Sequence, residues 1–154
     1  MSTSNYSSDL HTSQVAAKDN SALLIQDGAL LTGNVQSATA RWTRPAGVVY
    51  PSGDIVNVVV VELPTGALIL PGLSSIHASV SGTGIGVKVH VGDDTETFLE
   101  GSAAGLPTGV HPQIFAATSA KITTPTKVTV KLTLAADIPA AWNFQITIAY
   151  ATAA

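Results

Sequence analysis

The chain has 154 residues, of which 45% are hydrophobic and only 11% charged, with a net charge of −3 and no cysteine. Disulfides, thiolate nucleophiles and cysteine-based zinc sites are therefore excluded, and the slight negative charge leaves no electrostatic footprint for a nucleic acid. No apolar run is longer than four residues, as at 58–61, far short of the ~20 residues that a membrane-spanning helix needs. We expect neither a nucleic-acid nor a membrane partner.

The first third of the chain, residues 1–54, differs from the rest, and we expect it to be an N-terminal arm that contains a short hairpin. Residues 1–20 are rich in Ser, Thr and Asn and show no sustained period, which predicts an extended N-terminal arm. Asp27-Gly28 then separates two short apolar runs, a signal for a small hairpin. Trp42 stands between Arg41 and Arg44. Trp and Arg are frequent at interface hot spots, so Trp42 is a candidate partner anchor; the alternative is that it covers one end of the core. The candidate partner interface is Leu23, Leu24, Ile25, Leu30, Leu31, Arg41, Trp42 and Arg44.

Residues 55–154 follow as one strand after another. Apolar and polar residues alternate most clearly from Ile85 to Val91, which would leave His90 on the outward face of its strand. The run of four valines at 58–61 suggests a strand that is buried on both faces. The expected strands are 55–63, 67–70, 74–81, 85–91, 97–99, 113–117, 120–123, 127–134 and 142–150. Short strands at this spacing predict an all-β, antiparallel β-sandwich domain over 55–154. Periodicity does not separate a jelly-roll from an Ig-like topology.

Residues that could carry chemistry are sparse. His11, His77, His90 and His111 are scattered without the spacing of a metal site. The carboxylates of Asp93, Asp94 and Glu96 form the densest charged spot, which fits either a cation site or a solvated turn. No acid and base are paired in a recognisable motif, so we expect no catalytic residues, no cofactor and no enzymatic activity.

Three segments together carry a resemblance to a known group of proteins. They are the turn Leu63-Pro64-Thr65-Gly66-Ala67, the strand that runs into Val91-Gly92-Asp93-Asp94 with Phe98 close behind, and the alternating strand at 142–150. Over residues 55–150, the chain resembles small β-sandwich virion proteins of tailed bacteriophages, described as head decoration or cement-like proteins. The resemblance implies a role by packing, with no catalytic residues to carry over, and a location on the capsid surface of a virion.

The low charge favours the same conclusion independently, because the centres of large interfaces are depleted of charge. The sequence thus predicts a capsid decoration protein that stabilises the head by surface packing. Its partners would be the major capsid protein and copies of itself, as a homodimer or homotrimer. The alternative is a tail- or fibre-associated module that recognises glycans or a host surface.

Overall fold

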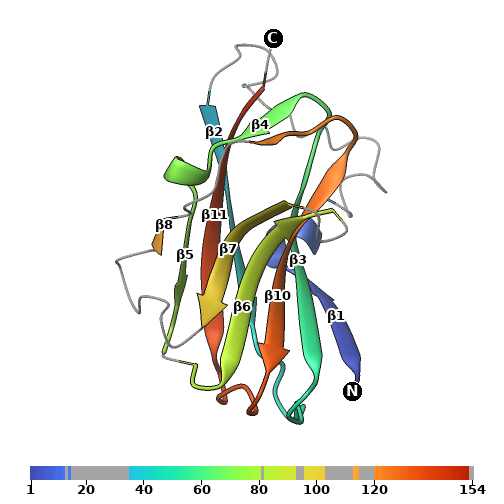
Figure 1. The fold of residues 1–154 in the computed structure, drawn as a ribbon, viewed down its shortest axis with the longest axis vertical. Coiled ribbons are helices and arrows are strands. Elements are labelled where there is room, and N and C mark those ends of the chain that lie inside the picture. The colour runs from blue at the N-terminus through green and yellow to red at the C-terminus, as the bar shows by residue number, and fades with distance from the viewer. Residues whose placement is uncertain are drawn as a thin grey trace.

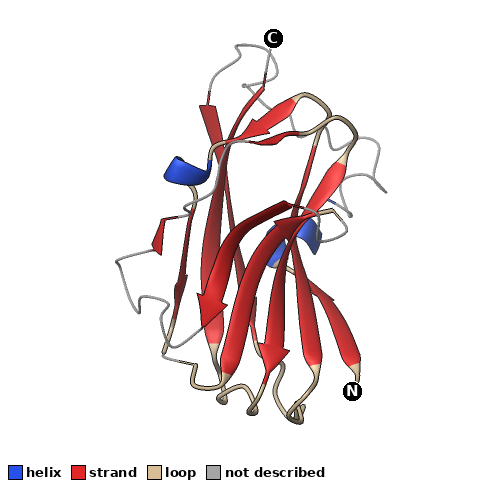
Figure 2. Cartoon of the chain, viewed as in Figure 1, coloured by secondary structure: helices blue, strands red, loops and turns tan. Residues whose placement is uncertain are grey.

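The computed structural model describes residues 1–12, 14, 35–80, 82–92, 96–102, 113–114 and 120–152. Within these residues, two sheets pack face to face (Figure 1). Helix is limited there to a short segment that includes residues 9–12 and to the 3-10 turn η1 (Pro71–Leu73) (Figure 2). The predicted all-β sandwich is confirmed.

Each sheet has a long strand near its middle. Sheet A contains, in spatial order, β1 (Thr3–Ser7), β3 (Ile55–Leu63), β10 (Thr126–Leu134), β6 (Ile85–Val91) and β7 (Glu96–Ser102). Sheet B contains, in spatial order, β2 (Val35–Thr43), β11 (Asn143–Thr152), the pair β5 (Ser75–Ala78) and β4 (Ala67–Ile69), and the pair β8 (Gln113–Ile114) and β9 (Ala120–Lys121). Among the described strands, β1 alone runs parallel to its neighbour, and every other pairing is antiparallel.

The core lies between the sheets and follows the alternation of the sequence. On β11, the side chains of Phe144, Ile146 and Ile148 are fully buried, while the residues between them face outward. Val130 and Leu132 on β10 meet them from sheet A and are also fully buried. Burying an aliphatic or aromatic side chain of this size contributes roughly 1.5–3 kcal/mol, so the facing rows hold the sheets together.

Two β-bulges place neighbouring residues on the same side of sheet A. On β3 the register with β10 skips Val60, so Val60 and Val61 both enter the core while Val59 faces outward and is half-buried. The expectation that the valine run is buried on both faces is therefore corrected. On β7 the register with β6 skips Phe98, and both Phe98 and Leu99 are buried. Bulges bend a strand and increase its twist, so sheet A is bent where these rows lie.

The segment expected to be an arm contains two strands of the sandwich. β1 pairs with β3 and extends sheet A, and β2 pairs with β11 over nine residues from Asn143 to Ala151. Strand β1 forms from a polar sequence because backbone groups make the pairing, and the adjacent edge of β3 would otherwise be left unpaired. The expected hairpin around Asp27-Gly28 lies outside the described residues. The chain starts at one end of the sandwich and β11 leaves it at the other (Figure 1).

Candidate interaction surface

The residues predicted to form a partner interface divide into two groups. Leu23, Leu24, Ile25, Leu30 and Leu31 lie outside the described residues. Arg41, Trp42 and Arg44 lie at the end of β2 and directly after it, and the structure gives each a different environment.

Trp42 is part of the core. Its side chain is 5% exposed, and its ring centroid lies 5.6 Å from Tyr6, 6.4 Å from Trp142 and 5.9 Å from Phe144. Tilted and edge-on aromatic pairs at these separations stabilise a core beyond the area they bury. Trp42 therefore covers one end of the core, as in the alternative interpretation of the sequence, and is not an exposed anchor.

Arg44 joins two loops. Its guanidinium donates to the backbone carbonyl of Val48 and forms an ion pair with Asp137, with 3.2 Å between Nη2 and Oδ2. The guanidinium also lies 5.7 Å from the centroid of the Tyr50 ring, a cation–π distance. Asp137 Oδ1 in turn accepts the backbone N–H of Tyr50 at 3.0 Å. With the Arg44 side chain only 11% exposed, this group shapes the loops more than it offers charge to a partner.

Tyr50 and Tyr6 share a hydrogen bond of 2.7 Å between their hydroxyl oxygens. Burial of Tyr50, and then this bond, raise the pKa of its hydroxyl well above the ordinary value of 10.0, although Arg44 opposes the shift. The hydroxyl therefore stays protonated at neutral pH, and its function here is to hold β1 against the loop before β3.

Arg41 is the exposed residue of the three. Its guanidinium donates to Gln145 Oε1 at 3.1 Å on the outer face of sheet B. The next row of that face pairs the hydroxyls of Thr39 and Thr147 at 3.0 Å. Around Arg41, this outer face therefore carries neutral hydrogen-bonding side chains.

The N-terminal segment, residues 2–12 with Gln14, is held along the full length of β3. At its start, Asp54 accepts the backbone N–H of Ser2 at 2.9 Å and the Ser2 hydroxyl at 2.8 Å. These two bonds and the nearby terminal amine hold the pKa of the Asp54 carboxyl below its model-compound value of 3.8, despite desolvation. At the far end, the Gln14 side-chain amide donates to the Glu62 carbonyl at 3.2 Å and accepts the Glu62 N–H at 3.0 Å.

Ser8 connects β1 to the helical turn that follows. Its backbone N–H donates to the Val59 carbonyl at 2.7 Å and its hydroxyl donates to the Val60 carbonyl at 2.5 Å. The same hydroxyl oxygen accepts the His11 N–H at 3.0 Å, which makes Ser8 the N-cap of the turn. Asp9 then accepts the backbone N–H of Arg41 at 2.9 Å, which joins the segment to β2.

The loop end of the sandwich consists of the described residues 44–54, 79–80, 82–84 and 135–142, where the chain crosses between the sheets at the bottom of Figure 1. Val49 is 72% exposed and Val80 48% exposed, and the exposed residues around them include Ala46, Pro51 and Ala140. Among the described residues of these loops, Asp137 is the one charged side chain that is well exposed, and it is paired with Arg44. Most exposed side chains of the loop end are thus apolar, with Ser52, Ser79 and Thr83 as uncharged polar exceptions.

Sequence reasoning missed this surface, although a signal was present. Val48 and Val49 lie between Gly47 and Pro51, in a loop where the sequence predicts no strand that would bury them. Apolar residues at such a position point either into the core or toward a partner. The structure gives both outcomes, because Val48 packs against the core while Val49 is exposed.

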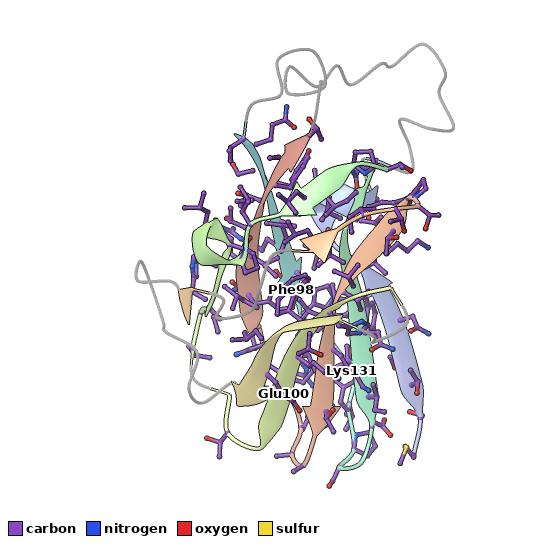
Figure 3. The ribbon with its side chains drawn as sticks, turned by 45° about the horizontal axis from the view of Figure 1, so that its top comes forward. Phe98, Glu100 and Lys131 are labelled. Carbon is purple, nitrogen blue, oxygen red and sulfur yellow. The ribbon has the colours of Figure 1, made fainter. Side chains whose placement is uncertain are left out.

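The outer face of sheet A carries a second candidate surface, a polar hollow of about 370 Å³ that crosses β1, β3, β10 and β6. One row of this outer face has Asn5, Asn57, Lys131, Lys88 and Glu100 on successive strands, and its first three residues line the hollow (Figure 3 labels Lys131 and Glu100). The next row contains His90, which was expected to be exposed but is only 7% exposed. His90 lies beside the bulge at Phe98, and this local irregularity in strand pairing is invisible in the alternation of the sequence.

In the carboxylate cluster, Asp93, Asp94 and the side chain of Glu96 lie outside the described residues. In the part that the structure does describe, no three His, Asp or Glu side chains form a group that could hold a metal ion. No helix there has the length and hydropathy needed to span a bilayer.

No protein-family model matches the chain, and no curated protein matches its sequence. A solved structure does have a similar fold: a chain of the acidic stable capsid of Helicobacter pylori bacteriophage KHP30. The two chains share a fold. The TM-score is 0.51 at 19% sequence identity, over 76% of this chain and 86% of the other. The phage chain is therefore the shorter of the two, and the likeness includes most of it.

Proposed function

We propose that this chain is a structural protein of a bacteriophage virion, that it decorates the capsid surface, and that it acts by packing and not by catalysis. The observation that carries the proposal is the fold likeness to a chain of the KHP30 phage capsid, which includes 86% of that chain. Fold alone does not define function, so the proposal also depends on the surface of this molecule.

The connectivity of the sandwich supports the proposal. If β4 and β5 count as one interrupted strand, and β8 and β9 as another, the sheets have the orders β2-β11-β4/5-β8/9 and β3-β10-β6-β7. From β2 to β11 the chain changes sheet at every connection except the β6–β7 hairpin. We infer that this is a jelly roll of two Greek keys, a fold that viral capsid and lectin domains use.

The loop end is the described surface best suited to a shell contact. Val49 and Val80 would lose apolar surface to water on binding, which is worth about 25 cal/mol per Å² before association costs. The one well-exposed charge there, Asp137, is already paired with Arg44 and leaves little charge to desolvate. Repeated over a symmetric shell, even weak contacts of this kind add up through avidity. The proposed partners are the major capsid protein and other copies of this chain; a contact through Leu23–Leu31 stays a prediction.

The experiment compares binding of variants to purified shells that lack this chain. Val49→Glu buries a charge in the proposed contact and should weaken binding about tenfold or more, because an unpaired buried charge costs well over 1.4 kcal/mol. Leu73→Glu is the matched control, since Leu73 is 63% exposed on η1, away from the loop end. Equal binding by both variants would reject the loop end as the contact surface.

The copy number of the chain in purified particles, measured by quantitative mass spectrometry, tests the role itself. A simple ratio to the major capsid protein supports decoration of the shell. A few copies per particle would place the chain in the tail or at a vertex, and its absence from particles would overturn the virion proposal.

The glycan-binding alternative needs either an exposed aromatic side chain, from Tyr6, Trp42 or Tyr50, or a carboxylate-lined groove near Trp42 or Asp93-Asp94. Trp42 is buried in the core, Tyr50 is 1% exposed, and Tyr6 is half-buried against both. Asp93 and Asp94 lie outside the described residues. No described residue favours that alternative over the virion role, so it is not proposed as a second function.

A further inference from the structure

The N-terminal segment adds a strand to the edge of sheet A without being joined to its neighbour β3 by a hairpin. Strand β1 pairs with β3 in parallel, so no tight turn connects the two strands. Between Gln14 and Val35 lie the twenty residues 15–34, a length that can span up to about 66 Å when extended. The distance along the sequence thus allows the segment to reach the β3 edge of its own chain or that of a neighbour.

The contacts of the segment are concentrated on one continuous stretch of the chain. The bonds described above go to Arg41, Tyr50, Asp54, residues 55–60 and Glu62. This stretch is the end of β2, the following loop and β3. Without the segment, the β3 edge would leave a row of backbone groups unpaired, and the buried Tyr50 hydroxyl would lose its partner. The β3 edge is therefore best stabilised when a strand covers it. It binds that strand through backbone pairing and through the hydrogen bond between Tyr50 and the strand's Tyr6.

We propose that the β3 edge also accepts the N-terminal segment of a second copy of this chain, so that two copies exchange their β1 strands. The exchanged pair makes the same contacts as the single chain, which is why such swaps form at low cost. The balance then depends on the effective concentration of the tethered segment against the concentration of neighbouring copies. Crowding of copies on any assembly would favour exchange. The inference does not depend on the proposed virion function.

The absence of cysteine from the sequence allows a direct test. Asn57 Nδ2 donates to Asn5 Oδ1 at 3.2 Å across the β1–β3 pair. Neighbouring strands lie about 4.8 Å apart, within the range that a disulfide spans. In the double variant Asn5→Cys/Asn57→Cys, refolded and then oxidised, an unexchanged chain gives a covalent monomer. An exchanged pair gives a covalent dimer, which a non-reducing gel separates.

The matched control is Thr39→Cys/Thr147→Cys, a cross-strand pair of comparable separation between β2 and β11. We expect several-fold more covalent dimer from the Asn5/Asn57 variant than from this control, with a share that rises with the protein concentration during refolding. Covalent monomer alone at every concentration, or the same dimer share as the control, would overturn the proposal.

A second measurement uses the two single variants, Asn5→Cys and Asn57→Cys, refolded together in equal amounts. A disulfide that joins one variant to the other can form only between copies. Mass spectrometry should find more of this mixed dimer than of the two like-with-like dimers combined, which is more than random pairing gives. The reason is that exchange places position 5 of one copy beside position 57 of the other. A statistical mixture of the three dimers from chains that show native circular dichroism would count against exchange.

Discussion

Ser2 gives both its backbone N–H and its hydroxyl to the carboxylate of Asp54, across fifty-two positions of sequence. The Ser2 carbonyl also accepts the N–H of Ile55 at 2.9 Å. The first residues of the chain are thereby held at the point where β3 begins, and the parallel register of β1 starts from there. The contact depends on a charged carboxylate, so acid should release it.

Asp54→Asn should lower the melting temperature at neutral pH, because the neutral amide is a weaker acceptor for the two Ser2 donors. The Asp54 pKa in the folded state lies below the reference value of 3.8. Its stabilisation is thus full above that value and is lost as the pH falls through the lowered pKa. Melting curves of both proteins should converge in strongly acidic solution. A difference in melting temperature that is the same at every pH would contradict this account.

The raised pKa of Tyr50 predicts that the protein loses stability in alkaline solution. Its pKa is raised above 10.0 in the folded state, so the unfolded chain loses its proton first. Stability from this residue is present below pH 10.0 and falls as the pH rises beyond it. Tyr50→Phe should be less stable at neutral pH, through loss of the Tyr6 bond, but should lose less on going to alkaline solution. Thermal unfolding over this range, with absorbance of the tyrosinate as a second signal, measures the effect.

Trp42→Ala should lower the free energy of unfolding by about 3–5 kcal/mol, the usual cost of removing a large buried aromatic side chain. Trp42→Phe should recover part of this loss, because a ring remains against Tyr6 and Phe144. Arg41→Ala is the control and should change stability by no more than about 0.5 kcal/mol, as expected for an exposed residue. Urea unfolding gives all three values. If Trp42→Ala left stability unchanged, Trp42 would not be a residue of the core.

Gly84 should tolerate substitution less well than Gly53, although both have a positive φ, of 74° and 92°. A Cβ on Gly84 would lie 3.0 Å from the Cβ of Ala136, whereas a Cβ on Gly53 would have no atom within 4 Å. Gly53→Ala should therefore cost only the backbone strain of about 1–2 kcal/mol, and Gly84→Ala should cost more. Adding Ala136→Gly to Gly84→Ala should restore the steric share alone. Equal costs for the two glycine variants would show that the contact with Ala136 relaxes freely.

The long central strands could be predicted because their sequences alternate. On β10 and β11, valine, leucine, isoleucine and phenylalanine at every second position indicated both the strand and its buried face. Strand β2 was missed because its inward positions include Gln36, Ala38 and Ala40, which carry little hydropathic signal. These residues lie inside because β11 pairs with them in register, and the Tyr150 hydroxyl donates to Gln36 Oε1 at 2.8 Å.

The candidate surfaces were harder to predict, since they depend on residues that are distant in sequence. The hollow on sheet A has Asn5, Asn57 and Lys131 in one row, and no local pattern gives that register. The bulges that bring Val60 with Val61 and Phe98 with Leu99 into the core leave no signature that separates them from ordinary alternation. Trp42 between two arginines fitted either an interface or a core cap, and only its contacts with Tyr6 and Trp142 decided the matter.

Strand β1 begins and β11 ends at opposite ends of the sandwich, and this arrangement determines where a fused protein would lie. Met1 is almost fully exposed beside the loop end, while β11 carries the chain to Thr152 at the far end (Figure 1). A bulky fusion before Met1 would lie at the same end of the sandwich as the loop end and could obstruct the proposed shell contact. A fusion after residue 154 would project away from it. Cargo attached there would be displayed outward from a decorated particle, with the contact surface left free.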